Sequence, residues 1–186
     1  MDPNINRTRL GLGAWRAGSH GMQNPKFQGQ ATVMNDMKAL VLYHSEEFGN
    51  TAKMAEAVAE GLREGGLEVD SHNTLDGRFP IEEFAGYDCA AFGSPDYYSY
   101  VAGALKTFMD DHYIARVRKG VEGLQGKPYS LFYSHGGGGR VASAMEGLFK
   151  YVGTQVGKPV GCYLTPDAGA LKECRALGKR LAEACK

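Results

Sequence analysis

The sequence predicts an α/β domain, a three-layer sandwich around a five-stranded parallel sheet with strand order 2-1-3-4-5. Short apolar segments alternate along the chain with segments of helical periodicity, which is typical of this fold class. The apolar segments are nearly continuous, which indicates strands covered by helices on both faces. Ligands bind to such sheets at the carboxyl ends of the strands where the strand order reverses. We therefore expect binding loops after strands one, three and four.

The first half of the predicted domain alternates strand, helix and strand. An apolar run at 39–43 is the first strand, and a helical pattern follows the polar turn that ends it. The helix has apolar residues at i, i+3, i+4 and i+7, namely Ala55, Val58, Ala59 and Leu62. The Gly65-Gly66 pair predicts its end, and the next two strands are expected at 67–74 and 87–93.

The second half continues the alternation. We expect strands at 128–134 and 158–164. Helices are predicted at 102–111, 140–156 and 166–184, where apolar residues recur at helical spacing. The remaining connections are 76–86, which has room for one helical turn, and 113–126, whose pattern is ambiguous.

The turn at 44–51, after the first strand, has the composition of a phosphate-binding loop. N–H groups at a helix start have no partner within the helix, and the helix dipole adds positive charge there. Ser45, Asn50 and Thr51 supply further donors. The turn has no Gly-Lys-Ser/Thr, no G-x-G-x-x-G and no Lys or Arg, so it suits a single terminal monophosphate. The alternative is an ordinary capped helix after a strand.

Two further loops lie after the third and fourth strands. The loop 93–100, G-S-P-D-Y-Y-S-Y, places three tyrosines within four residues, which gives a flat surface with hydroxyl groups. The loop 134–140, S-H-G-G-G-G-R, lets backbone amides approach a flat ring closely. Alternatively, the tyrosines cover the sheet edge and the glycines form a mobile tether. The position of the glycines directly after a core strand argues against a tether.

Three segments together carry a resemblance to a known family. Y-H-S-E-E-F-G-N-T resembles the phosphate loop of the flavodoxin-like family, G-S-P-D-Y-Y-S-Y-V-A-G-A-L-K-T-F-M-D its flavin-ring loop, and S-H-G-G-G-G its third loop. The resemblance runs from about residue 38 to the C-terminus and is nearest the branch of FMN-dependent NAD(P)H:quinone reductases. It implies a flavodoxin-like fold, FMN as cofactor and NAD(P)H as reductant.

The resemblance also implies which residues contact FMN. The phosphate is expected at Ser45, Gly49, Asn50 and Thr51. The isoalloxazine is expected beside Ser94, Pro95, Tyr97 and Tyr98, and beside Ser134, His135, Gly136 and Gly137. One departure is that Ser45 lies four residues before Gly49, whereas the common family pattern has three, so either the loop is one residue longer or Glu46 takes the first position. A carboxylate beside a phosphate is unfavourable, so Glu46 and Glu47 are expected to point outward.

The function predicted on this basis is a flavoprotein oxidoreductase that passes electrons from NAD(P)H to a quinone or similar flat acceptor. His135 is the candidate catalytic residue, as a hydrogen-bond donor to reduced flavin or to a quinone oxygen; alternatively it only packs or faces solvent. A second reading is an electron carrier without a substrate of its own, which acts on a redox partner protein. A third is FMN bound for a regulatory or partner-binding role. The residues favour the enzyme and leave the others open.

The first 36 residues differ from the rest and are interpreted as a leader or an expression-derived segment that is expected to be disordered, with 37–186 as the FMN-binding domain. They have no sustained periodicity, and G-S-H-G-M at 18–22 resembles a cloning scar. They lack the apolar segment of a signal peptide, whereas an Arg-rich transit peptide stays an alternative. The whole chain is formally neutral, and 37–186 holds 17 basic and 19 acidic residues.

This charge balance argues against nucleic acid as a partner, and no apolar stretch reaches membrane-spanning length. The four cysteines, which show no C-x-x-C or zinc spacing, suggest reduced thiols in a cytoplasmic protein. Asp110-Asp111-His112 lacks a second histidine, so no metal site is predicted. We also expect a homo-oligomer.

Overall fold

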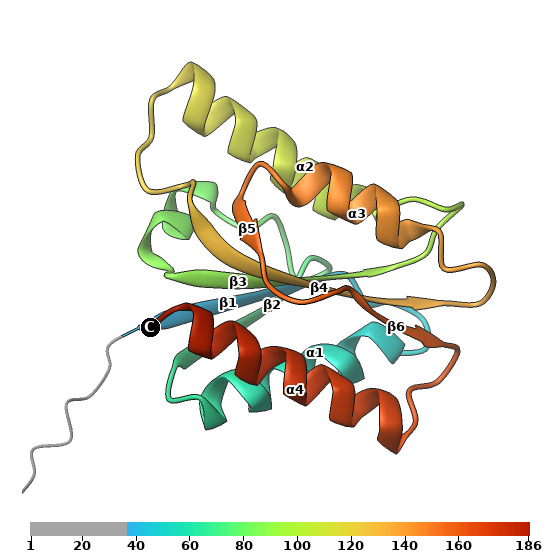
Figure 1. Cartoon of the computed structure of the whole chain (residues 1–186). Coiled ribbons are helices and arrows are strands. Elements are labelled where there is room, and N and C mark those ends of the chain that lie inside the picture. Colours follow the sequence, from blue (N-terminus) through green and yellow to red (C-terminus); the bar gives the residue numbers. More distant parts are fainter. Residues whose placement is uncertain (1–36) are drawn as a thin grey trace, which may run out of the picture. The chain divides into compact units, whose positions relative to one another are not determined.

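The computed structural model describes residues 37–186, and the predicted leader at 1–36 lies outside the described residues. A central sheet separates two layers of helices (Figure 1). Helices α1 (Asn50–Glu64) and α4 (Ala168–Ala184) cover one face, and α2 (Gly103–Tyr113) and α3 (Val141–Phe149) cover the other. Within residues 37–186, no helix combines the length and the apolar character that crossing a membrane requires.

The sheet has the predicted topology. Its strands are β1 (Lys38–Tyr43), β2 (Glu68–Asn73), β3 (Cys89–Pro95), β4 (Lys127–His135), β5 (Gly153–Gln155) and β6 (Val160–Tyr163). All neighbouring strands are parallel, and the order is β2-β1-β3-β4-β5, with β6 also paired to β4. The expected α/β fold class and strand order are therefore confirmed.

The fifth position of the sheet differs in detail from the sequence prediction. The helix expected at 140–156 ends at Phe149, and the chain then forms β5 before reaching β6. A Cβ atom at Gly153 would lie 2.2 Å from the carbonyl oxygen of Lys127, so only glycine permits this close approach to β4. The edge strand is thus split into two short pieces, and the apolar residues after Phe149 belong to the edge rather than to a longer helix.

Alternation of side chains along the strands builds a separate core on each face of the sheet. Leu40 and Leu42 of β1 are buried against the α2 and α3 layer, whereas Ala39 and Val41 are buried against the α1 and α4 layer. On the α2 and α3 side, the rings of Phe92 and Phe149 stack with their centroids 4.2 Å apart. This two-sided burial explains the continuous apolar runs in the sequence.

The two connections that the sequence did not define clearly, 76–86 and 113–126, each contain a short helical turn. A 3-10 helix at Ile81–Gly86 follows β2, and a π-helical turn at Ile114–Arg118 extends α2. Neither lies at the carboxyl edge of the sheet. The loops that begin at that edge follow β1, β2, β3, β4 and β6.

Candidate cofactor-binding site

The loops after β1, β3 and β4 meet at the carboxyl edge of the sheet and enclose a pocket of about 200 Å³. The residues that line it are Ser45, Glu46, Glu47, Phe48, Gly49, Asn50, Thr51, Pro95, Asp96, Tyr97, Ser134, His135, Gly136 and Leu164. The structure thus brings together parts of all three loops that the sequence singled out. Leu164, after β6, adds an apolar wall that the sequence did not indicate.

The first wall of the pocket is the turn into α1. Gly49 has φ of 66°, a left-handed conformation that favours glycine, and no atom lies near a Cβ built there. The first helical hydrogen bond runs from the N–H of Lys53 to the carbonyl of Gly49 at 3.0 Å. The N–H groups of Asn50 and Thr51 therefore precede the helical ladder and have no acceptor within α1.

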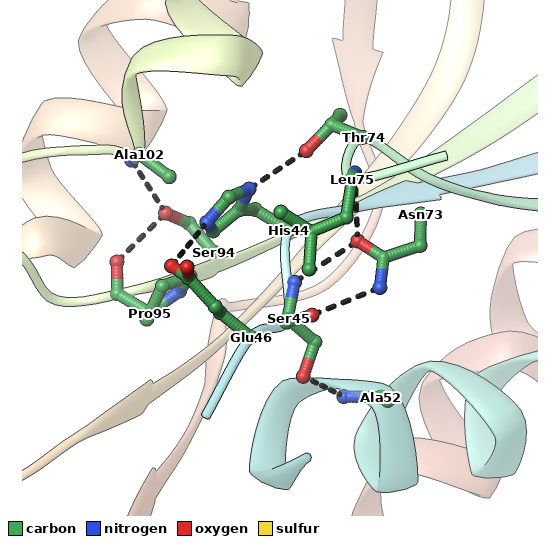
Figure 2. Close-up of polar contacts among 10 residues, drawn as sticks. All are labelled: His44, Ser45, Glu46, Ala52, Asn73, Thr74, Leu75, Ser94, Pro95 and Ala102. Atoms are coloured by element: carbon green, nitrogen blue, oxygen red, sulfur yellow. Dashed lines mark hydrogen bonds and ion pairs between the residues drawn. The ribbon is translucent and has the colours of Figure 1, made fainter. Parts of the chain in front are cut away.

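Ser45 is held rigidly at the end of β1 (Figure 2). Asn73 clamps its backbone from β2: the Ser45 N–H donates to Asn73 Oδ1 at 3.2 Å, and Asn73 Nδ2 donates to the Ser45 carbonyl at 2.9 Å. The Ser45 Oγ accepts from the Ala52 N–H at 3.0 Å. Because Oγ is the acceptor in that bond, the hydroxyl hydrogen stays available for a ligand.

Thr51 and Ser134 join the first and third loops. Their hydroxyl oxygens lie 2.8 Å apart, and both residues are buried. If Ser134 donates, the Thr51 hydrogen is free to donate into the pocket. Nearby, Oδ1 of Asn50 is buried and has no partner among the described residues. Such an orphan atom is rare in folded proteins, and a bound molecule commonly completes its hydrogen bonding.

The second loop is a tight hairpin. Tyr97 and Tyr100 exchange two backbone hydrogen bonds of 3.1 Å, and Tyr98 and Ser99 form the tip. Both tip residues have positive φ, 52° and 64°, which is the arrangement of a type I′ turn and is unfavourable for residues other than glycine, asparagine and aspartate. Tyr97 lines the pocket, whereas the side chain of Tyr98 is fully exposed at the tip.

Two polar residues hold the hairpin in place. Ser94 is completely buried behind the pocket: its hydroxyl donates to the Pro95 carbonyl at 2.7 Å and accepts from the Ala102 N–H at 3.0 Å (Figure 2). The Asp96 carboxylate accepts from the N–H of Ser99 at 2.7 Å and from that of Val141 at 3.3 Å. Ser94 therefore contacts the loop rather than the pocket, and Asp96 connects the hairpin to α3.

The third loop places His135 at the pocket wall. Its Nδ1 lies 2.6 Å from the Gly137 carbonyl oxygen, so Nδ1 carries a hydrogen and donates to this carbonyl. The ring also lies near two aromatic rings, with centroids 5.8 Å from Tyr133 and 5.7 Å from Tyr163. Gly136 lines the pocket beside this ring, whereas Gly137 is not among the lining residues and contacts the ring through its carbonyl oxygen.

The charges around the pocket are acidic. Its lining, within the described part of the chain, contains Glu46, Glu47 and Asp96 and no Lys or Arg. Both glutamates are exposed to solvent but also line the pocket, so their predicted outward orientation stays a prediction, and Glu46 lies 3.7 Å from Nε2 of the buried His44. Partial burial, followed by the charges of Glu46 and Glu47, raises the pKa of Tyr97, so this phenol stays protonated well above neutral pH.

The sequence missed the residues that support the pocket from a distance. His44 donates its backbone N–H to Gly93 O at 3.0 Å, and its Nδ1 lies 2.8 Å from Thr74 Oγ1. Asn73 clamps Ser45 across 28 positions of sequence. Polar residues at the ends of β1 and β2 only weakly predict these supporting hydrogen bonds. The bonds follow only once it is known that the two strands are neighbours in the sheet.

A family model for flavodoxins matches residues 41–178, which includes every loop of this pocket. The chain belongs to the flavodoxin family. The domain resembles a flavodoxin from the domain Archaea with a TM-score of 0.69 and 27% identity, over 80% of this chain and 99% of that one. It also resembles a WrbA-like flavodoxin from Agrobacterium tumefaciens, with a TM-score of 0.63 and 20% identity, over 81% and 98% of the two chains.

Curated relatives of this flavodoxin-family chain include an NAD(P)H dehydrogenase (quinone) from Brucella anthropi. The two are 38% identical over 92 residues, which cover 40% of this chain and 46% of the relative. The match thus spans less than half of the relative's length. The sequence expectation of a flavodoxin-like chain near the quinone reductases is confirmed at the level of family and similarity.

Proposed function

We propose that the pocket binds FMN and that the protein passes electrons from NAD(P)H to a quinone or a similar flat acceptor. The observation that carries the proposal is the juxtaposition of two surfaces. Neutral donors converge at the start of α1, and beside them the loops after β3 and β4 present an aromatic ring and a glycine-rich backbone. A phosphate linked to a flat heterocycle suits both surfaces.

The phosphate would lie at the start of α1. The Ser45 hydroxyl and the N–H groups of Asn50 and Thr51 are free to donate there, and so is the Thr51 hydroxyl when Ser134 donates to it. A helix N-terminus favours anions because the backbone donors and the dipole act together. None of the lining residues in the described range 37–186 is cationic, so the site suits one monophosphate better than the diphosphate of a dinucleotide.

The isoalloxazine would lie between Tyr97 and the third loop. Tyr97 and Pro95 form one side, and His135, Gly136 and Leu164 form the other. The glycine leaves room for the ring edge to approach the backbone. When bound, FMN supplies the redox chemistry, as it takes up a hydride and returns electrons to an acceptor.

His135 is the candidate proton donor of the site. Because Nδ1 donates to Gly137, the neutral ring offers only Nε2, as an acceptor. Donation toward a quinone oxygen or the reduced cofactor therefore requires the protonated ring, in which both nitrogens carry hydrogen. The bond to Gly137 fixes the ring orientation in either state, so His135 would transfer a proton from Nε2.

The second candidate function is electron transfer between protein partners, with no substrate of its own. It is favoured by the likeness to an archaeal flavodoxin along nearly the whole length of that protein. Against it, residues 37–186 carry a net charge of only −2 by sequence, whereas electrostatic steering of a partner requires a strongly charged face. The quinone reductase name of the curated relatives also favours the enzyme.

Anaerobic stopped-flow absorbance distinguishes the two functions. The FMN-loaded protein is mixed with NADH or NADPH, and flavin bleaching is followed near 450 nm before reoxidation by benzoquinone. A reductase should be bleached at about 1–1000 per second, the usual range of enzyme turnover. Bleaching that takes minutes with both nucleotides would overturn the reductase and leave the carrier.

A further inference from the structure

The loop proposed to bind the phosphate contains two consecutive glutamates, Glu46 and Glu47, directly after Ser45. A carboxylate weakens the binding of an anion at short distance, because like charges repel. Both glutamates are exposed and line the pocket, whose lining within residues 37–186 contains no Lys or Arg. The direction in which each carboxylate points therefore affects how well this loop binds a phosphate.

His44 lies beside one of the two carboxylates. Its Nε2 is 3.7 Å from Oε2 of Glu46, which is within ion-pair range although longer than a hydrogen bond. Among residues 37–186, Glu46 forms no other ion pair, and Glu47 forms none. Figure 2 shows the Glu46 side chain directed toward the His44 ring, whereas the Ser45 Oγ is directed to Ala52 at the start of α1. The two groups thus point in different directions.

Thr74 determines which nitrogen of His44 carries the hydrogen that faces the glutamate. Thr74 Oγ1 lies 2.8 Å from Nδ1. If Nδ1 carried the only ring hydrogen, the lone pair of Nε2 would face the Glu46 carboxylate, and that arrangement is repulsive. The Thr74 hydroxyl therefore donates to Nδ1 of the neutral ring, and Nε2 carries the hydrogen. The neutral ring thus attracts the carboxylate, as the protonated ring does.

The position of the His44 ring is fixed by its surroundings. The residue is only 9% exposed, and its backbone N–H donates to the Gly93 carbonyl at 3.0 Å. Its ring meets the ring of Tyr97 edge to face, with centroids 6.0 Å apart and an interplanar angle of 77°. A buried, fixed ring therefore orients the exposed and otherwise unpaired side chain of Glu46.

We propose that His44 is a positioning residue that holds the Glu46 carboxylate away from the phosphate of the bound cofactor and so favours FMN over an uncharged flavin. The inference rests on the proposed function, because it concerns the phosphate site of FMN. His44 is not among the pocket-lining residues of the described range, so it acts through Glu46. Glu47, which has no such partner among residues 37–186, is not oriented in this way.

The test compares FMN and riboflavin binding to wild type and His44→Phe by fluorescence titration at low ionic strength. Phenylalanine keeps a ring and removes both nitrogens. FMN affinity should fall by about threefold or more, the size of an interaction between partly exposed charges, whereas riboflavin affinity should stay nearly unchanged. His72→Phe is the matched control and should change neither, because His72 bonds to Gly77 outside the pocket. A parallel loss for both flavins, or no loss for FMN, would overturn the proposal.

A double-mutant cycle identifies the group through which His44 acts. Glu46→Gln should raise FMN affinity more in His44→Phe than in the wild-type background, because only there is the carboxylate released. Glu47→Gln should raise it equally in both backgrounds. Equal effects of Glu46→Gln in the two backgrounds would show that His44 does not orient this carboxylate.

Long-range ¹H–¹⁵N spectra of the wild-type protein test the arrangement without a substitution, and they decide if His44→Phe does not fold. The His44 ring should carry a hydrogen on Nε2. A neutral ring with its hydrogen on Nδ1 alone would overturn the inference. Equal affinity of the wild type for FMN and riboflavin would overturn the proposed phosphate site together with the inference, whereas a parallel loss in His44→Phe would overturn the inference alone.

Discussion

Uncharged side chains form the part of the pocket in which we propose that the phosphate binds. Ser45 and Thr51 are buried, and each has an oxygen fixed by one protein hydrogen bond, from the Ala52 N–H or with Ser134. The Ser45 hydrogen is left for a ligand, and so is the Thr51 hydrogen when Ser134 donates to Thr51. The loss of either one should therefore weaken binding without removing a charge from the site.

The first prediction is that Thr51→Val and Ser45→Ala each weaken FMN binding by about tenfold or more. A hydrogen bond to a charged group contributes about 1.5–3 kcal/mol, and valine keeps the shape of threonine. Thr107→Val is the matched control, because its hydroxyl bonds only to Gly103 within α2. Fluorescence titration with FMN measures the affinities. Unchanged affinity in both variants would show that the phosphate binds elsewhere.

The sequence was sufficient to predict those site residues whose role follows from their place in a single strand–turn–helix segment. Gly49 and Thr51 follow from their place in a strand–turn–helix segment, and the structure brings both to the pocket. The bracing by Asn73 and Asp96 could not be read, because each bonds residues on other loops, which the sequence does not place side by side. The buried position of Ser94 depends likewise on the hairpin closing over it.

At the scale of the element, the 97–100 hairpin is the most unusual structure in the domain. Two consecutive residues other than glycine have positive φ at its tip. Such conformations persist only where the surroundings hold them, and Ser94 and Asp96 supply the bonds that do so. The result is one tyrosine in the pocket wall and one that is fully exposed at the tip of the hairpin.

The second prediction separates these two tyrosines. Tyr97→Ala should lower FMN affinity and quinone turnover together, because Tyr97 lines the pocket. Tyr98→Ala should lower quinone turnover more than FMN occupancy, because its exposed ring, next to Tyr97 in the chain, is accessible to an incoming acceptor. Tyr113→Ala, at the exposed end of α2, is the control. Steady-state kinetics and flavin content give the two readouts; equal loss of both in Tyr98→Ala would contradict this assignment.

The third prediction concerns the stability of the fold at acid pH, which depends on His112 in α2. His112 is buried, with Nε2 2.8 Å from the Leu124 carbonyl oxygen. Burial, aided by the charge of Arg116 and opposed by the Leu124 bond, lowers its pKa in the folded state. The unfolded chain therefore binds more protons as pH falls, so stability is retained above about pH 6.5 and is lost as pH falls toward the folded-state pKa.

His112→Gln, which keeps a donor for Leu124, should consequently show a smaller loss of unfolding free energy between pH 7 and pH 5 than the wild type. Urea denaturation at each pH measures it. His72→Gln, near the surface, is the control. An identical pH dependence in wild type and His112→Gln would refute the assignment.

At the scale of the whole molecule, the sequence was sufficient to predict the architecture. Continuous apolar strands and helices of regular period are local signals, and they predicted the strand order that the structure confirms. The split of the edge strand was missed because it depends on the close approach of Gly153 to β4. An apolar segment after a helix looks the same whether it continues the helix or joins a sheet edge.

The fourth prediction is that a chain beginning at Met37 binds FMN with unchanged affinity. Among residues 37–186, those that line the pocket lie between Ser45 and Leu164, and β1 begins at Lys38. FMN titration of the shortened and full chains, with thermal melting as a second readout, measures the effect. Weaker binding or a melting temperature lower by several degrees would show that residues before Met37 contribute.

The central claim is that uncharged hydrogen-bond donors in the pocket bind the monophosphate of FMN. Comparing the affinities of FMN and riboflavin tests this claim most directly. The two share the isoalloxazine and differ only in the phosphate. Anaerobic fluorescence titration should give a dissociation constant for riboflavin at least about tenfold higher than for FMN, because several charge-assisted hydrogen bonds are lost. FAD should also bind more weakly than FMN. Equal affinity for FMN and riboflavin would contradict the account.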